Sequence, residues 1–348
     1  MSAYPEAPSP KPPNPPRKPT ADDALPPVSA PDASFILQLF LIPLVIVMII
    51  VMVWLLFSWL AHLGSDPKEL VRDLKVLNEG SWQKANTLSD MLRNREYDYL
   101  KDDEELAGEL SAVLLADLES GSTDEKRLRM RYFLCRALGE FRVDTGLPAL
   151  LAASRPGDAA DQGMDVRYAA IEALAVLAHN IGPDKLADDT EVLDALVAAS
   201  RETAEGGPQR DRAEELRSTA AFTLGVLGGE RALDRLHEML ADPHPNTRFN
   251  AATGLARHGE LQAIPVLLDM LDAQNAAAVE GERSDSERER KRMLVLINGI
   301  RAARQLAEQR PEQPLEDVRA ALRELQAGQL PNAVRLEAAE ALNAFSSA

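Results

Sequence analysis

Cysteine is almost absent from this chain. Cys135 is the single cysteine among 348 residues, which excludes an intrachain disulfide framework, a redox-active pair of thiols and a zinc site built from several cysteines. Cys135 stands in the apolar stretch RYFLCRALG, residues 131–139. We therefore expect it to be a small core side chain and not a nucleophile.

Basic residues are also in short supply. The chain has 38 Lys and Arg residues against 55 Asp and Glu residues, which gives a formal net charge of −17. Proteins bind nucleic acids by neutralising phosphates with basic side chains, so no nucleic-acid partner is expected. A protein partner with a cationic segment suits the charge better, and this is the partner that we predict.

The usual motifs of catalysis and cofactor binding are missing as well. The sequence contains no GxxxxGK[ST] phosphate loop, no GxGxxG fingerprint and no GxSxG elbow. The segment HEMLA, residues 237–241, lacks the second histidine of the HExxH metalloprotease motif. His237, His244 and His258 are interpreted as isolated histidines and not as a metal cluster. We therefore predict no catalytic, cofactor-binding or metal-ligating residue, and no cofactor.

Large apolar residues are nearly absent from residues 1–33, where proline dominates. Such a segment cannot bury a core, so it is predicted to be a disordered or polyproline-like tail. Within it PPNPPR, residues 12–17, matches the PxxPxR pattern of ligands that dock as a preformed polyproline helix. Proline-rich tails produce such matches by chance, and a flexible spacer is the favoured interpretation.

Charged residues are absent from Ala33 through Ser65, and this stretch is strongly apolar. At about 1.5 Å per residue, a helix over 34–63 exceeds the roughly 30 Å hydrocarbon core of a bilayer. We predict a single transmembrane helix with Trp54 and Trp59 as anchors at the membrane interface. A cleaved signal peptide would have a shorter apolar stretch beside a basic segment. A buried core helix is the remaining alternative.

Basic residues flank the predicted span on both sides in equal number: Lys11, Arg17 and Lys18 before it, and Lys68, Arg72 and Lys75 after it. The second set lies closer to the span, where the positive-inside bias is strongest, and this favours a cytosolic location for residues 66–348. Because the counts are equal, the opposite orientation stays open.

Residues 66–348 repeat one helical pattern. The helix DVRYAAIEALAVLA, residues 165–178, has relatives at residues 215–228 and 246–259. The copies share an arginine that is followed seven residues later by a leucine, which occurs at Arg131, Arg167, Arg217, Arg248 and Arg335. Another apolar helix precedes each copy, so the repeating unit is a helical pair. One pair cannot bury its apolar face alone, so successive pairs must stack. We predict an all-α fold, an α-solenoid of about seven helical pairs.

These copies resemble HEAT repeats, and more narrowly the bacterial variety called phycobilisome-lyase-like HEAT repeats, over about residues 103–348. Two segments carry the resemblance best: DPHPNTRFNAATGLARHG, residues 242–259, and DVRYAAIEALAVLA, residues 165–178. The family's acidic turn position falls six residues before an arginine and is occupied by Asp161, Asp211 and Asp242; Glu125 occupies it in the first copy and Gln329 departs from it. The resemblance implies that these acids and arginines form a structural ladder of contacts along the stack. Iron-binding hydroxylases built on HEAT repeats have several His-Glu dipeptides, whereas this chain has only His237-Glu238, which disfavours a metal site.

Long polar segments interrupt the repeats. The longest is AQNAAAVEGERSDSERERKR, residues 273–292, and two further connections are predicted at 155–163 and 201–214. Insertions of this kind project along one edge of a solenoid and are often where it binds. Four residues of the longest insertion are the candidates for partner binding: Glu280, Glu282, Arg283 and Asp285. The alternative is that polar loops are merely tolerated at this edge.

The predicted function is that of a membrane-anchored scaffold that presents an acidic HEAT-repeat surface to a protein partner. The alternative is an enzyme or enzyme subunit, with a lyase-like or modifying activity whose residues are too dispersed for motif searches. That alternative requires polar groups that converge in a pocket, with perturbed pKa values. The fold by itself does not decide between the two.

Overall fold

The computed structural model describes residues 32–62, 67–75, 80–156 and 163–345, and every regular element in these ranges is a helix. The chain forms two compact units, residues 1–64 and residues 65–348. Nearly all of the predicted proline-rich tail, including its PxxPxR match, lies outside the described residues. The two units are considered separately below.

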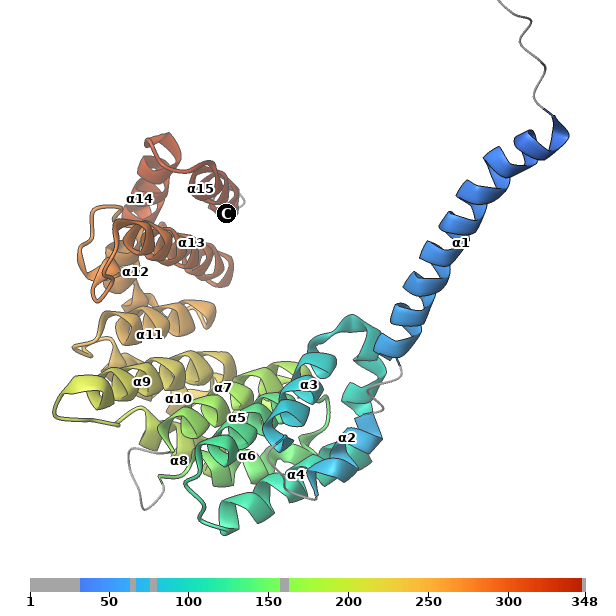
Figure 1. Cartoon of the computed structure of the whole chain (residues 1–348). Coiled ribbons are helices and arrows are strands. Elements are labelled where there is room, and N and C mark those ends of the chain that lie inside the picture. Colours follow the sequence, from blue (N-terminus) through green and yellow to red (C-terminus); the bar gives the residue numbers. More distant parts are fainter. Residues whose placement is uncertain (1–31, 63–66, 76–79, 157–162, 346–348) are drawn as a thin grey trace, which may run out of the picture. The chain divides into compact units, whose positions relative to one another are not determined.

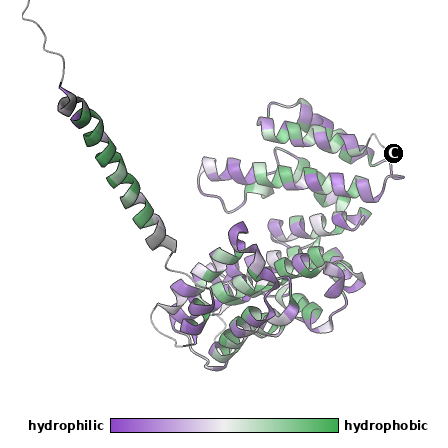
Figure 2. Ribbon diagram, turned by 90° about the vertical axis from the view of Figure 1, so that its right-hand side faces the viewer, coloured by the Kyte–Doolittle hydropathy of each residue, from purple (hydrophilic) through white to green (hydrophobic). Residues whose placement is uncertain are grey.

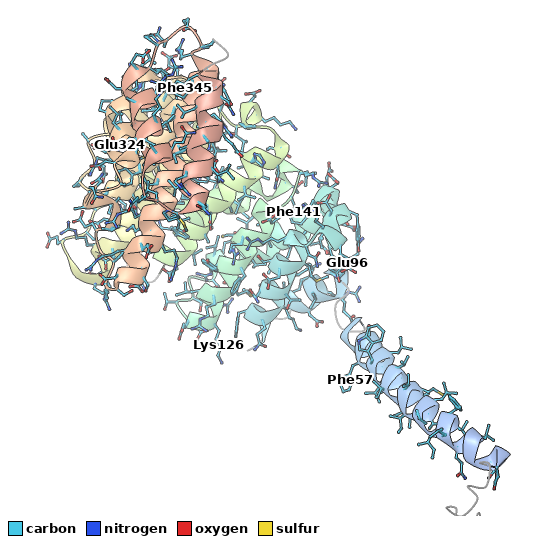
Figure 3. The ribbon with its side chains drawn as sticks, turned by 90° about the horizontal axis from the view of Figure 1, so that it is seen from above. Phe57, Glu96, Lys126, Phe141, Glu324 and Phe345 are labelled. Atoms are coloured by element: carbon cyan, nitrogen blue, oxygen red, sulfur yellow. The ribbon has the colours of Figure 1, made fainter. Side chains whose placement is uncertain are left out.

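The helix of the first unit is α1, Ala33–His62, 30 residues long. Its segment Leu37–Ser58 has a mean hydropathy of 3.2 and none of it is buried. At about 1.5 Å per residue these 22 residues span about 33 Å. Side chains project from every side of the helix (Figure 3), and those of Trp54 and Phe57 are 66% and 65% exposed. Trp59 also belongs to α1, but its side chain lies outside the described ones. By length and composition alone, α1 can be a membrane anchor or a signal sequence.

The second unit consists of seven consecutive helical pairs within the described residues (Figure 1). The first three pairs are α2 (Pro67–Leu74) with α3 (Ser81–Arg93), α4 (Glu104–Glu119) with α5 (Glu125–Gly139), and α6 (Leu147–Ser154) with α7 (Met164–Ile181). The next two are α8 (Thr190–Ala199) with α9 (Gly207–Leu227), and α10 (Glu230–Met239) with α11 (Pro245–Arg257). The last two are α12 (Ile264–Leu271) with α13 (Asp285–Gln309), and α14 (Glu316–Ala327) with α15 (Asn332–Ala344). The predicted all-α solenoid is confirmed.

Short 3-10 segments join some of these helices: η2 (Arg95–Asp102), η3 (Asp144–Gly146), η4 (Pro183–Lys185), η5 (Leu261–Ala263) and η6 (Ala277–Val279). The predicted long connection over 201–214 is wrong, because α9 already begins at Gly207. Pro208 suits the first turn of a helix, and the polar residues after it are good helix formers. The predicted insertion over 273–292 follows α12, and its residues from Asp285 onward belong to α13. A capping box of Ser284 and Glu287 marks the start of that helix.

The odd-numbered helices α3 to α15 pack closely against one another along the whole row, whereas neighbouring even-numbered helices pack much less closely. In a curved stack the tighter spacing belongs to the inner side, so the odd-numbered helices line the inner face of the solenoid. The core lies between the two series, and apolar residues concentrate there (Figure 2). Of the five leucines that follow the repeat arginines, four are fully buried: Leu138, Leu174, Leu224 and Leu255.

Close approach on the inner side depends on small residues. A methyl group added at Gly225 of α9 would lie 2.6 Å from the Cα of Gly254 on α11, which is far inside van der Waals contact. At Gly108 on α4, the same methyl group would meet only Thr145 Cγ2 at an ordinary 3.6 Å. The backbones of α9 and α11 therefore touch directly, and no larger residue fits between them.

We predict opposite effects of alanine at these two glycines. Gly225→Ala should lower the free energy of unfolding by about 1–3 kcal/mol through overpacking. Gly108→Ala should leave it unchanged or raise it by up to about 1 kcal/mol through helix propensity. Thermal unfolding of the detergent-solubilised chain, followed by circular dichroism at 222 nm, measures both. Equal transition midpoints for the two variants would contradict the close contact between α9 and α11.

Candidate functional site

The repeat arginines lie on the second helices of their pairs. Four of them point toward the end of the first helix, where carbonyl oxygens lack intrahelical donors. Their guanidinium groups donate to main-chain oxygens of that region: Arg131 to Asp117 at 2.6 Å, Arg167 to Ser154 at 3.2 Å, Arg217 to Glu202 at 3.0 Å and Arg248 to Asp242 at 2.7 Å. A cation at this end also opposes the helix dipole. Each arginine thereby holds the two helices of its own pair together.

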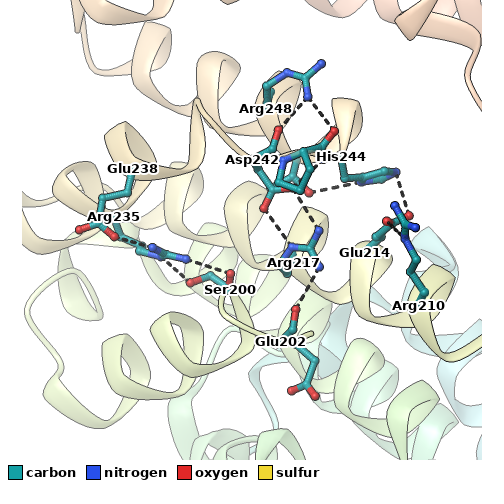
Figure 4. Close-up of polar contacts among 12 residues, drawn as sticks. Ser200, Glu202, Arg210, Glu214, Arg217, Arg235, Glu238, Asp242, His244 and Arg248 are labelled. Carbon is teal, nitrogen blue, oxygen red and sulfur yellow. Dashed lines mark hydrogen bonds and ion pairs between the residues drawn. The ribbon is translucent and has the colours of Figure 1, made fainter. Parts of the chain in front are cut away.

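Two of these arginines also bind the following pair. Arg217 of α9 donates two hydrogen bonds to Asp242, just after α10, with Nε–Oδ2 at 2.9 Å and Nη2–Oδ1 at 3.1 Å. Figure 4 shows this contact. Both side chains are 10% exposed. Arg167 of α7 forms an ion pair with Glu202, just after α8, with Nη2–Oε2 at 2.9 Å. Because Asp242 also accepts from the main-chain nitrogen of His244 at 2.8 Å, one carboxylate fixes both the neighbouring pair and the turn before α11.

Not all of the acidic residues make the ladder contacts that the family resemblance implies. Asp161 lies outside the described residues. Asp211 is exposed on α9 and makes no ion pair with the described part of the chain. Arg131 takes Asp117 as its partner instead of Glu125, which lies six residues before it.

Asp117 is fully buried and binds Arg127 as well, with Arg127 Nε at 2.6 Å. The sequence analysis did not predict Asp117, because this residue lies in the last turn of α4, before the turn in which the family places its acidic residue. Arg335 is exposed on α15 and contacts Asn332 of the same helix.

The four candidate residues of the insertion have different surroundings. Glu282 pairs with Lys291 of α13 at 3.1 Å, and Asp285 is the first residue of α13, where it pairs with Arg288 at 3.0 Å. Lys291 also donates to the main-chain oxygen of Glu280 at 3.0 Å, which holds the insertion against α13. Arg283 is exposed. The Glu280 carboxylate has no ion pair within the described ranges and lines a cavity.

Three cavities that share residues open along the inner face and its edge, and together they form what we call the inner groove. The first, of about 520 Å³, lies between the start of α9, the turn before α11 and the insertion. The second, of about 320 Å³, lies across α7, α9 and α11. The third, of about 450 Å³, lies across α9, α11 and α13. His244 and Asn246 join the first two cavities, and Phe222 and Asn250 join the last two.

The residues that line the groove recur at helical spacing on each helix. They are Tyr168 and Glu172 on α7, Glu215, Thr219 and Phe222 on α9, Asn246, Asn250 and Thr253 on α11, and Lys291, Leu294, Asn298 and Arg301 on α13. Our reading of the sequence missed these residues. A sequence pattern could have identified some of them. The positions one and five residues after a repeat arginine face the groove, as Tyr168 and Glu172 do after Arg167.

His244 is the titratable group at the junction of two cavities. Burial lowers the pKa of its imidazole, although the carboxylates of Glu214 and Asp242 oppose the change and the cations of Arg217 and Lys291 reinforce it. Its Nδ1 lies 3.3 Å from Thr247 Oγ1, and its Nε2 lies 4.0 Å from Glu214. The neutral imidazole is therefore the form that the fold favours.

The described residues give little support for thiol chemistry or metal binding. Cys135 is fully buried, and this burial raises the pKa of its thiol to about 12, so it stays protonated. No group of three or more His, Cys, Asp or Glu side chains in the described ranges is arranged to hold a metal ion.

The comparison with known families matches part of the second unit. Residues 209–282, from within α9 to within the insertion, match the family of HEAT repeats. The second unit therefore contains HEAT repeats in this range. The phycocyanobilin lyase subunit alpha of Picosynechococcus sp. is 38% identical over 94 residues, which are 27% of this chain and 34% of that protein. The match therefore spans about a third of that relative. The solved structure of human deoxyhypusine hydroxylase in complex with glycerol is 18% identical and covers 77% of this chain and 97% of its own, with a TM-score of 0.26.

We predict that two acids at equivalent repeat positions differ in importance. Asp242→Ala should lower the free energy of unfolding by about 3 kcal/mol, because it leaves the nearly buried Arg217 without its carboxylate. Asp211→Ala should change it by less than about 0.5 kcal/mol, because that side chain is exposed and makes no ion pair with the described residues. Urea unfolding of the detergent-solubilised chain measures both. Similar losses for the two variants would contradict the assignment of Asp242 as the contact between neighbouring pairs.

A second prediction concerns pH. The folded pKa of His244 lies below its unfolded value of about 6.5, so its contribution to stability is complete above that pH and is lost as the pH falls below it. We expect the melting temperature to fall more for the native chain than for His244→Gln between pH 7.5 and pH 5.5. Scanning calorimetry of both proteins tests this, and parallel pH profiles would refute it. Glu214, Asp242, Arg217 and Lys291, which face His244, are present in both proteins.

Proposed function

We propose that this protein is a membrane-anchored scaffold whose HEAT-repeat solenoid presents an acidic surface to a protein partner. The length and composition of α1 support the anchor. Residues 34–348 contain 35 Lys and Arg residues against 51 Asp and Glu residues, so the solenoid is strongly acidic. This charge disfavours contact with anionic lipid and favours a cationic partner.

The observation that carries the proposal is the inner groove. It runs across four helices, and the apolar side chains of Phe222 and Leu294 are 42% and 53% exposed within it. An exposed apolar surface with a polar rim is typical of interaction sites. Extended concave surfaces of this kind are what solenoids use for binding.

The anchor serves this function by confining the solenoid to a membrane surface. Only a few residues separate α1, which ends at His62, from α2, which begins at Pro67. A partner in the same membrane or at its surface therefore meets the solenoid at a raised local concentration. The basic residues Lys68, Arg72 and Lys75 near the span favour a cytosolic solenoid.

The anchor has a direct test. We expect the full chain to stay in the membrane pellet after alkaline carbonate extraction, and a variant without residues 34–62 to become soluble while keeping its helical circular dichroism. The intact mass of the membrane-bound protein must include α1. A mature chain that begins after α1 would identify α1 as a cleaved signal and contradict the anchor. Protease treatment of right-side-out and inverted vesicles then gives the orientation.

The scaffold role has a separate test. A photo-crosslinking amino acid is placed at Phe222 in the inner groove, at Glu280 in the insertion, or at Glu324 on the outer helix α14, in cells that make the protein naturally. A scaffold should give a defined protein adduct from the groove or the insertion, and not from Glu324. Absence of any protein adduct from the first two positions would contradict the proposal.

The partial similarity to phycocyanobilin lyase subunit alpha supports a second candidate, a lyase-like enzyme or enzyme subunit. Under that proposal the purified chain should bind phycocyanobilin and change its visible absorption spectrum. The scaffold proposal expects no such change. Titration of the detergent-solubilised protein with the chromophore, followed by absorption spectroscopy, separates the two.

A further inference from the structure

The second cavity of the inner groove contains two carboxylates without cationic partners. Glu172 of α7 and Glu215 of α9 both line it, and neither forms an ion pair with any residue that the structure describes. Tyr168 lies four residues before Glu172 on the same helix face. Burial, followed by the charge of Glu172, raises the pKa of the Tyr168 phenol, which is consistent with a negative potential in this cavity.

The first cavity extends this negative region toward the insertion. Asp211 and Glu280 line it, and both carboxylates lack ion pairs among the described residues. The two cations in its wall are already neutralised, since Arg210 pairs with Glu214 at 2.9 Å and Lys291 pairs with Glu282 at 3.1 Å. Four unpaired carboxylates therefore face the connected first and second cavities: Asp211, Glu280, Glu172 and Glu215.

The third cavity adds exposed apolar side chains and free side-chain amides beside the acidic region. Phe222 and Leu294 are exposed there, and the side-chain amide of Asn298 has no hydrogen-bond partner in the described part of the chain. The amide of Asn246 is free in the same sense, whereas Asn250 donates to Ser218 at 2.9 Å and keeps its oxygen available. Free amides at such spacing suit the main chain of an extended peptide, whose own donors and acceptors need partners.

We propose that the inner groove binds an extended basic segment of the partner protein. Its basic side chains lie between Glu172 and Glu215, with further basic residues toward Asp211 and Glu280, and an adjacent apolar side chain rests on Phe222 and Leu294. A peptide is the expected ligand because its basic side chains complement the carboxylates and an apolar side chain can cover Phe222 and Leu294. Phosphate-bearing ligands are repelled by the same carboxylates. This inference rests on the proposed scaffold function and identifies its site and the chemistry of its partner.

The test uses the full chain in phosphatidylcholine nanodiscs and a fluorescein-labelled peptide of sequence Gly-Ser-Arg-Lys-Gly-Leu-Ser-Gly. Fluorescence anisotropy should show binding that weakens with added salt. Replacing Arg and Lys of the peptide by Glu should abolish it. Glu172→Gln with Glu215→Gln should weaken binding at least about tenfold, because two charge contacts near the surface are lost.

The matched control is Glu119→Gln with Glu324→Gln. It removes the same charge from two exposed carboxylates on α4 and α14 that form no ion pair within the described ranges. It should change the affinity by less than about twofold, because charges beyond the Debye length are screened. Phe222→Ala tests the apolar contact with the peptide leucine. It should weaken binding of the peptide severalfold and leave a peptide with Gly in place of Leu unaffected. Circular dichroism of each variant verifies folding.

Equal weakening by the control variant would show general attraction between opposite charges and would overturn the proposed site. Absence of peptide binding to the native chain would overturn it too. Neither result touches the scaffold function, which fails only if crosslinking from Phe222 and Glu280 captures no protein. A crosslinked partner that is captured from Glu280 and not from Phe222 would retain the scaffold and refute the proposed binding between Glu172 and Glu215 and on Phe222.

Discussion

The structure of the solenoid depends on one constraint: no helical pair can bury its apolar face without its neighbours. The tightest expression of this constraint is the contact between Gly225 and Gly254, where the backbones of α9 and α11 touch. A similar contact recurs where Gly139 of α5 meets the backbone of Ala173 of α7. Close spacing on this side and looser spacing on the other make the stack curve. The curvature in turn creates the inner groove, which no single repeat contains.

The arginines add a second level of order. Apolar burial is non-directional, so it does not by itself fix how one pair is rotated against the next. Arg217 supplies that direction, because its planar guanidinium meets Asp242 through two hydrogen bonds and a carbonyl of its own pair through a third. The deep burial of these charges means that the contact mainly specifies geometry, since desolvation offsets much of the electrostatic attraction.

The architecture could be predicted from the sequence because each repeat has the same spacing of apolar residues, and this spacing lies within a single helix. The arginine and the leucine seven residues later mark the same helix in every copy, so the number of pairs and the all-α fold followed directly. Contacts between pairs were less predictable. Asp211 and Asp242 occupy equivalent positions, yet only Asp242 meets an arginine, because the acid that an arginine reaches depends on the turn after the preceding helix. The groove residues were missed for a related reason: Tyr168, Glu215 and Asn250 stand far apart in the sequence and come together only when three pairs stack.

The unpaired carboxylates of the groove also explain why an anchor and an acidic solenoid suit one another. Like charges such as Glu172 and Glu215 in one cavity repel and lower stability, so no structural benefit accounts for them. Their field is also short-ranged, because salt screens exposed charges over about 8 Å at physiological ionic strength. Such a groove cannot draw a basic segment from far away in solution. It can hold one that is already close, and in the proposed scaffold the confinement of both proteins to a membrane surface provides that proximity. In that proposal the tether governs the encounter, and the groove governs which segment is retained.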